Sequence, residues 1–85
     1  MNIQLRFFAG IRETLGMAKE AVNLPDGIDS VGAVRNFLIE RGGVWEQALN
    51  EQRPLRMAYN QEMADTRTPI AEGGEIAFFP PVTGG

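Results

Sequence analysis

Only one stretch of this 85-residue chain predicts a helix long enough to cover a sheet, and strand-like segments flank it on both sides. The helix is expected from about residue 31 to residue 41. Its apolar side chains recur at helical spacing, at Val31, Val34, Phe37 and Leu38. The stem of Arg41 extends this stripe, Asp29 or Ser30 can cap the first turn, and Gly42-Gly43 ends the helix. One helix of this length covers one face of a small sheet.

The segments around the helix have the period of half-buried strands. Met1, Ile3, Leu5 and Phe7 alternate with polar residues. Further strands are expected over 20–24, 55–59, around Met63 and over 75–79, with possible helical turns over 9–16 and 44–49. The order predicts an α+β fold, a small mixed sheet of about five strands with one main helix on one face. We expect residues 1–79 to form this domain and residues 80–85 to form a flexible C-terminal tail.

The composition excludes several function classes. Cysteine and histidine are both absent, which removes disulfides, thiol chemistry and most zinc, haem and iron–sulfur sites, and no metal site is expected. The net charge is −3 and no basic stripe is present, so nucleic acid is not an expected partner. The first residues lack the long apolar stretch of a signal peptide or a membrane span, and the expected location is the cytoplasm.

The C-terminal Gly84-Gly85 is the most specific chemical feature of the chain. Two glycines leave a thin strip of backbone around the terminal carboxylate, which a narrow pocket can admit. Pro80-Pro81 stiffens the base of the tail, and the six residues from Pro80 onwards span at most roughly 20 Å when extended. Because the domain has no cysteine, Gly85 is the best available place if the chain carries sulfur.

Strand alternation predicts that two aromatic side chains lie on the sheet face that the helix leaves open. If Leu5 and Phe7 face the helix, Phe8 points to the other side. If Phe78 faces inward, Phe79 points outward in the same way. We interpret Phe8 and Phe79 as a protein-docking surface near the tail. The alternative is that a β-bulge shifts the alternation and that both rings belong to the core.

The sequence resembles the ubiquitin-like β-grasp proteins, and within them the small, sulfur-carrying subunits of molybdopterin synthase. The segment 75–85, with its Phe-Phe-Pro-Pro-Val-Thr-Gly-Gly end, carries most of the resemblance. Other matching segments follow in order: Phe7-Phe8-Ala9, Arg12-Glu13, Leu15-Gly16, Ala58-Tyr59-Asn60-Gln61 and Thr68-Pro69-Ile70. Tyr59 departs from the small β-branched residue more common there, so packing around it is expected to differ. Arg56-Met57 is also less typical.

The resemblance implies a mechanism and a set of partners. A ubiquitin-activator-like enzyme consumes ATP to adenylate Gly85, and a sulfur donor such as a cysteine desulfurase or a rhodanese-type protein supplies the sulfur of a thiocarboxylate. The tail, Pro80, Pro81, Val82, Thr83, Gly84 and Gly85, then enters the active site of the large synthase subunit and gives sulfur to cyclic pyranopterin monophosphate. Met63 joins Phe8 and Phe79 at the interface, and the complex is a dimer of heterodimers. No cofactor stays bound, and no independent catalysis is expected.

Two other functions remain open from the residues alone. One is a sulfur carrier for thiamine thiazole synthesis or tRNA thiolation, although thiamine carriers are usually shorter and lack the Phe-Phe-Pro-Pro-Val segment. The other is a β-grasp interaction module without covalent chemistry. An independent enzyme is disfavoured, because no acid–base or nucleophile constellation is visible in the sequence.

Overall fold

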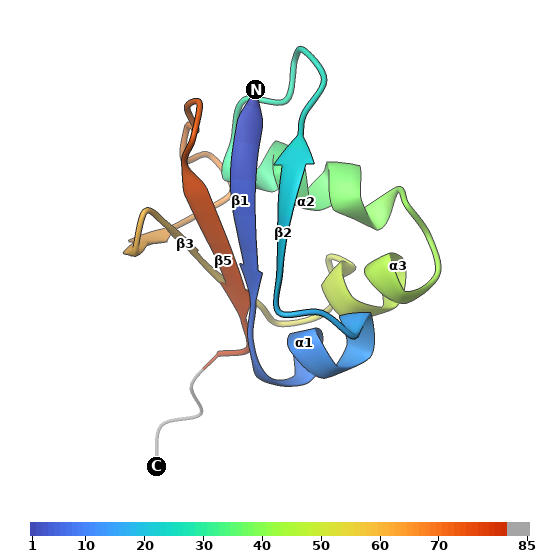
Figure 1. The fold of residues 1–85 in the computed structure, drawn as a ribbon. Helices are drawn as coiled ribbons and strands as arrows, with labels where there is room; N and C mark the ends of the chain where they lie inside the picture. Colours follow the sequence, from blue (N-terminus) through green and yellow to red (C-terminus); the bar gives the residue numbers. More distant parts are fainter. Residues whose placement is uncertain (82–85) are drawn as a thin grey trace.

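The computed structural model describes residues 1–81, which fold into a mixed five-stranded sheet with helices packed against it (Figure 1). The strands are β1 (Asn2–Phe7), β2 (Lys19–Asn23), β3 (Arg56–Tyr59), β4 (Glu62–Ala64) and β5 (Glu75–Phe79). The helices are α1 (Ala9–Leu15), α2 (Val31–Ile39) and α3 (Val44–Leu49). The strand order is β2-β1-β5-β3-β4, and the central pair β1 and β5 is parallel while all other neighbours are antiparallel. The expected mixed sheet of about five strands is confirmed.

The core lies between the sheet and the helices, as the alternation predicts. Every second residue of β1 is buried, and Ile76 and Phe78 of β5 are fully buried beside them. Phe7 stacks on Phe78 with ring centroids 6.1 Å apart, and Phe7 and Trp45 form a T-shaped pair with centroids 5.7 Å apart. The two aromatic contacts join the centre of the sheet to α3, so Trp45 closes one end of the core.

Helix α2 begins where the sequence predicts and ends earlier. The Ser30 hydroxyl accepts a hydrogen bond of 3.2 Å from the backbone N–H of Ala33, which confirms the cap. The helix ends at Ile39, and Arg41 does not extend the apolar stripe. Its guanidinium instead forms a 2.7 Å ion pair with Glu20 of β2 and lies 4.4 Å from the centre of the Trp45 ring. Glu20 is distant from Arg41 in sequence, so the helical period could not reveal the ion pair, and Trp45 follows beyond the end of α2.

Arg35 is the buried charged residue that the sequence did not reveal. Only 8% of its surface is exposed. Its Nε donates to the carbonyl of Leu49 at 2.7 Å, and Nη2 donates to the carbonyls of Asn50 at 2.6 Å and Arg53 at 3.3 Å. Burial lowers the pKa of the guanidinium below its ordinary value, and the nearby carboxylate of Glu51 opposes that shift. Arg35 therefore ties α2 to the end of α3 through backbone carbonyls.

The segment after β1 forms a complete short helix where only a possible turn was expected. Ala9 adopts a left-handed backbone conformation with φ of +51°, which turns the chain sharply after Phe8. Gly16 ends α1 with φ of +73°, and its N–H bonds the carbonyl of Arg12 at 2.9 Å. Ile11 and Leu15 are buried in the common core. Together α1 and α3 add two helices to the expected order.

Candidate functional site

The face of the sheet opposite α2 carries the side chains that the sequence proposed as a docking surface. Register places Arg6, Ala77, Ala58 and Met63 side by side in one row across four strands. In the next row Phe79 lies opposite Arg56, and Phe8 follows the Phe7–Phe78 pair. We call the apolar members of these rows the open-face patch, which consists of Phe8, Ala58, Met63, Ala77 and Phe79.

The members of the open-face patch differ in exposure. Phe8 is 43% exposed and Met63 is 62% exposed, which places both on the surface as expected. Phe79 is half-buried, so its ring is less open than the alternation alone predicted. The reason is its place on β5, where β1 and β3 flank it on both sides and shield the ring. The alternative that Phe8 belongs to the core is wrong.

Backbone geometry fixes Phe8 at the end of the sheet. Its N–H donates to the carbonyl of Phe78 at 3.2 Å, which continues the β1–β5 pairing by one residue. Its backbone is extended, with φ of −129° and ψ of 155°, and the left-handed Ala9 then turns the chain into α1. The guanidinium carbon of Arg6 lies 5.9 Å from the centre of the Phe8 ring. The Phe8 ring therefore lies outside the core, beside Arg6 on the open face.

The tail begins beside this patch. Strand β5 ends at Phe79, and the exposed Pro80 and half-buried Pro81 follow directly. Proline has no N–H for a ladder, so the strand stops there. Since Phe78 pairs with Phe7, Pro80 leaves the sheet at the same end as Phe8. Val82, Thr83, Gly84 and Gly85, which the sequence assigned to the chemistry, lie outside the described residues.

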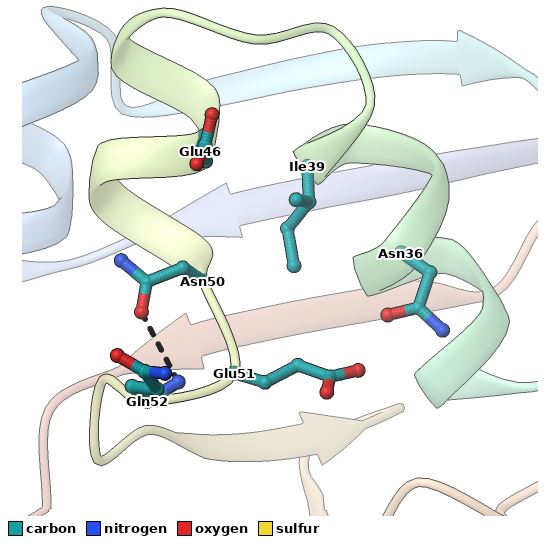
Figure 2. A pocket seen from close by; sticks show the side chains of 6 residues that line it. All are labelled: Asn36, Ile39, Glu46, Asn50, Glu51 and Gln52. Atoms are coloured by element: carbon teal, nitrogen blue, oxygen red, sulfur yellow. Dashed lines mark hydrogen bonds between the residues drawn. The ribbon is translucent and has the colours of Figure 1, made fainter.

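Two polar hollows lie on the helix side of the fold, away from the open-face patch. The first, of about 420 Å³, is lined by Asn36, Ile39, Glu46, Asn50, Glu51 and Gln52. Figure 2 shows these side chains coming from α2, α3 and the loop that follows, where the Asn50 side chain accepts a hydrogen bond from the Gln52 backbone. The second, of about 440 Å³, is lined by Gly32, Arg35, Asn36, Glu51 and Thr66. Neither hollow contains any residue that the sequence proposed for the site.

Two absences within residues 1–81 limit what the fold offers. No group of three or more His, Cys, Asp or Glu side chains in that range is arranged to hold a metal ion. Among the described helices, none is both long and apolar enough to cross a membrane.

Sequence reasoning missed two members of this surface. Ala58 lies between Met63 and Ala77 in the open-face patch, and Arg56 lies directly opposite Phe79. Their short or charged side chains give no apolar signal in the sequence. Ala58 reaches the patch because β3 pairs with β4 and β5, and Arg56 reaches it because β3 pairs with β5, a strand that is distant in the chain.

Comparison of the sequence with models of known protein families shows the family to which the chain belongs. The model of the ThiS family matches residues 5–85, which is nearly the whole chain. The chain belongs to the ThiS family. A protein of Haemophilus influenzae named molybdopterin synthase sulfur carrier subunit is 41% identical over 83 residues, covering 98% of this chain and 99% of the relative. A protein of Escherichia coli with the same name is 36% identical over the same length and coverage.

Solved structures agree on the β-grasp architecture. The small archaeal modifier protein 1 of Haloferax volcanii matches with a TM-score of 0.76 and 26% identity, over all of both chains. A structure of subunits 1 and 2 of the molybdopterin-converting factor from Helicobacter pylori contains a chain that matches with a TM-score of 0.69 and 23% identity, over all of both chains. At 23% identity, the similarity to the Helicobacter pylori chain concerns the fold alone. The expected ubiquitin-like fold is confirmed.

Proposed function

We propose that this ThiS-family chain is the sulfur carrier subunit of a molybdopterin synthase, with Gly85 as the residue that bears the sulfur. The observation that carries the proposal is the 41% identical relative of that name, which aligns over 98% of this chain. The family match extends to residue 85, so the Gly-Gly end lies within the matched length. A partner can bind the domain through the open-face patch beside Pro80 while the tail reaches the active site of that partner.

The terminal carboxylate needs activation before it can accept sulfur. With an unperturbed pKa of about 3.5 it is ionised at neutral pH and is a poor electrophile. Attack of this carboxylate on the α-phosphorus of ATP releases pyrophosphate and gives an acyl-adenylate. A persulfide of the sulfur donor then attacks the acyl carbon and expels AMP, and a donor thiol cleaves the resulting acyl disulfide. The products are a thiocarboxylate on Gly85 and a disulfide on the donor.

In this proposal the domain positions the tail and the partners supply the catalytic side chains. Residues 1–85 contain no cysteine, so sulfur cannot reside on a side-chain thiol of the carrier. The adenylating enzyme and the large synthase subunit each receive the tail in turn. In the second complex the thiocarboxylate gives its sulfur to cyclic pyranopterin monophosphate, and we expect two carriers to assemble with two large subunits. ATP is a substrate of the adenylating enzyme, and no cofactor remains on the carrier.

Intact-mass analysis tests the proposal. The chain is incubated with ATP, a cognate adenylating enzyme, a cysteine desulfurase and cysteine. The expected product is heavier by the replacement of one oxygen with sulfur, and deletion of Gly85 abolishes the gain. Co-purification at native levels then identifies the pathway: we expect the large synthase subunit. Recovery of a thiazole synthase, or no mass gain with the cognate enzymes, would overturn the proposal in favour of another carrier or of a non-covalent module.

A further inference from the structure

The charges around the open-face patch have the opposite sign to the charge of the whole chain. Within residues 1–81, the strand positions that face the open side carry Arg6, Lys19 and Arg56 as cations and Glu75 as the one carboxylate. The complete chain has a net charge of −3, with eight Lys and Arg against eleven Asp and Glu. On these strand positions the cations therefore outnumber the carboxylates by three to one, whereas carboxylates outnumber cations in the sequence as a whole.

The arrangement of these cations gives the isolated domain little stability. Arg6 lies directly opposite Lys19 in the antiparallel β1–β2 pair, and like charges in that position destabilise a sheet. The Arg6–Glu75 ion pair is 3.6 Å long, and its side chains are 46% and 31% exposed. Such an open pair contributes little to the free energy of unfolding. Intramolecular contacts alone therefore do not explain why Arg6 and Lys19 face each other.

Register also places the cations at the border of the apolar surface. Arg6 of β1 lies between Ala77 of β5 and Lys19 of the edge strand β2. Arg56 lies beside Phe79 on the other side of β5. An apolar centre with a charged border has the anatomy of a protein interface, in which the centre contributes affinity and the rim contributes orientation and rate.

We propose that Arg6, Lys19 and Arg56 form a basic rim that docks onto carboxylates surrounding an apolar hollow on the large synthase subunit. The identity of the partner rests on the proposed function, whereas the carboxylates on that partner are inferred from the charges of the open face. Complementary charge speeds association and is screened by salt. The partner must therefore present Asp or Glu side chains to both edges of the open-face patch, with an apolar pocket for Phe8 and Phe79 between them.

Stopped-flow association with the purified large subunit of the same organism tests the rim. The variant Arg6→Glu/Arg56→Glu is compared with Arg53→Glu/Arg67→Glu, which changes the net charge equally at exposed residues outside the strands. At low salt the first variant should associate at least about tenfold more slowly than the unaltered chain, and the difference should shrink at high salt. The control should associate close to the unaltered rate. The milder Arg6→Gln/Arg56→Gln variant repeats the measurement if the double reversal fails to fold.

Lys19→Glu separates docking from folding. Glutamate at residue 19 faces Arg6 as an opposite charge, so the Tm should not fall, while association with the large subunit should slow. Equal rates for the rim variants and the Arg53/Arg67 control, with the unaltered chain still binding, would overturn the basic rim and leave the proposed function intact. Failure of the unaltered chain to bind the large subunit at any salt concentration would overturn both.

Discussion

The phenol of Tyr59 occupies the space that a side chain at Gly74 would need. A Cβ built on Gly74 would lie 2.6 Å from Cε1 of Tyr59 and would overlap its hydroxyl. The same hydroxyl accepts a 2.8 Å hydrogen bond from the backbone N–H of Ala71, in the turn that leads into β5. Tyr59 therefore locks the turn before the strand from which the tail emerges.

Gly74→Ala should destabilise the domain by about 1–3 kcal/mol, because the added methyl group forces the Tyr59 ring to move. Chemical denaturation measures the change. Tyr59→Val should lose the hydrogen bond to Ala71 at a cost of about 1 kcal/mol. In the double variant the methyl group has room, so the two costs should not add. Strict additivity would contradict the contact between the two residues.

Arg35→Met should cost about 2–4 kcal/mol, because it leaves the carbonyls of Leu49, Asn50 and Arg53 without their donor. Arg35→Lys should recover only part of the loss, since a single ammonium cannot reproduce the forked geometry of a guanidinium. The matched control is Arg53→Met, whose side chain is exposed and whose backbone carbonyl is retained. Urea unfolding of the three variants checks the order. A stability of Arg35→Met equal to that of the control would contradict a structural role for the buried guanidinium.

The substitutions Ala9→Gly and Gly10→Ala should each stabilise the domain. Ala9 has φ of +51°, where an alanine costs about 1–2 kcal/mol, so Ala9→Gly should gain about 0.5–1 kcal/mol after the added chain entropy. Gly10 lies in α1, and no atom beyond its chain neighbours and the backbone of its own helix lies within 4 Å of the position that a Cβ would take there, so Gly10→Ala should gain about 0.5–1 kcal/mol. Thermal unfolding checks both. A loss of stability in Ala9→Gly would contradict the left-handed conformation at the Phe8 turn.

The features that the sequence predicted correctly are those set by neighbours in the chain. The alternation of β1 determines which of its residues are buried, and the Ser30 hydroxyl reaches a donor three residues away. Local sterics and local hydrogen bonds decide each of these features, so a short window of sequence contains the information.

The features that the sequence did not reveal depend on partners that are distant in the chain. The buried guanidinium of Arg35 donates its hydrogen bonds to backbone carbonyls that lie 14 to 18 residues further along the chain. Arg56 lies beside the open-face patch because β3 pairs with β5, which places it opposite Phe79. The half-burial of Phe79 has the same origin, since it follows from the central position of β5 in the sheet. Strand order and the choice of distant pairing partners are tertiary properties, which a short window of sequence does not contain.

Phe8→Asp should weaken binding to the large synthase subunit without unfolding the carrier. Phe8 is the N-cap residue of α1 and makes no side-chain cap hydrogen bond, whereas aspartate is a favoured N-cap, so the Tm should be retained. Removing the ring and adding a charge to an apolar contact should raise the Kd by about 30-fold or more, as measured by calorimetry. Met63→Asp, at the other end of the open-face patch, should act in the same direction.

Val44→Asp is the matched control for Phe8→Asp, because Val44 is 45% exposed and Phe8 43%, and Val44 lies on α3 instead of the open face. The control should leave the affinity for the large subunit unchanged. If Phe8→Asp and Met63→Asp bind as tightly as Val44→Asp, the partner does not contact the open-face patch. The tail would then reach the active site of its partner from another orientation of the domain, with Pro80 and Pro81 as its only described connection to the sheet.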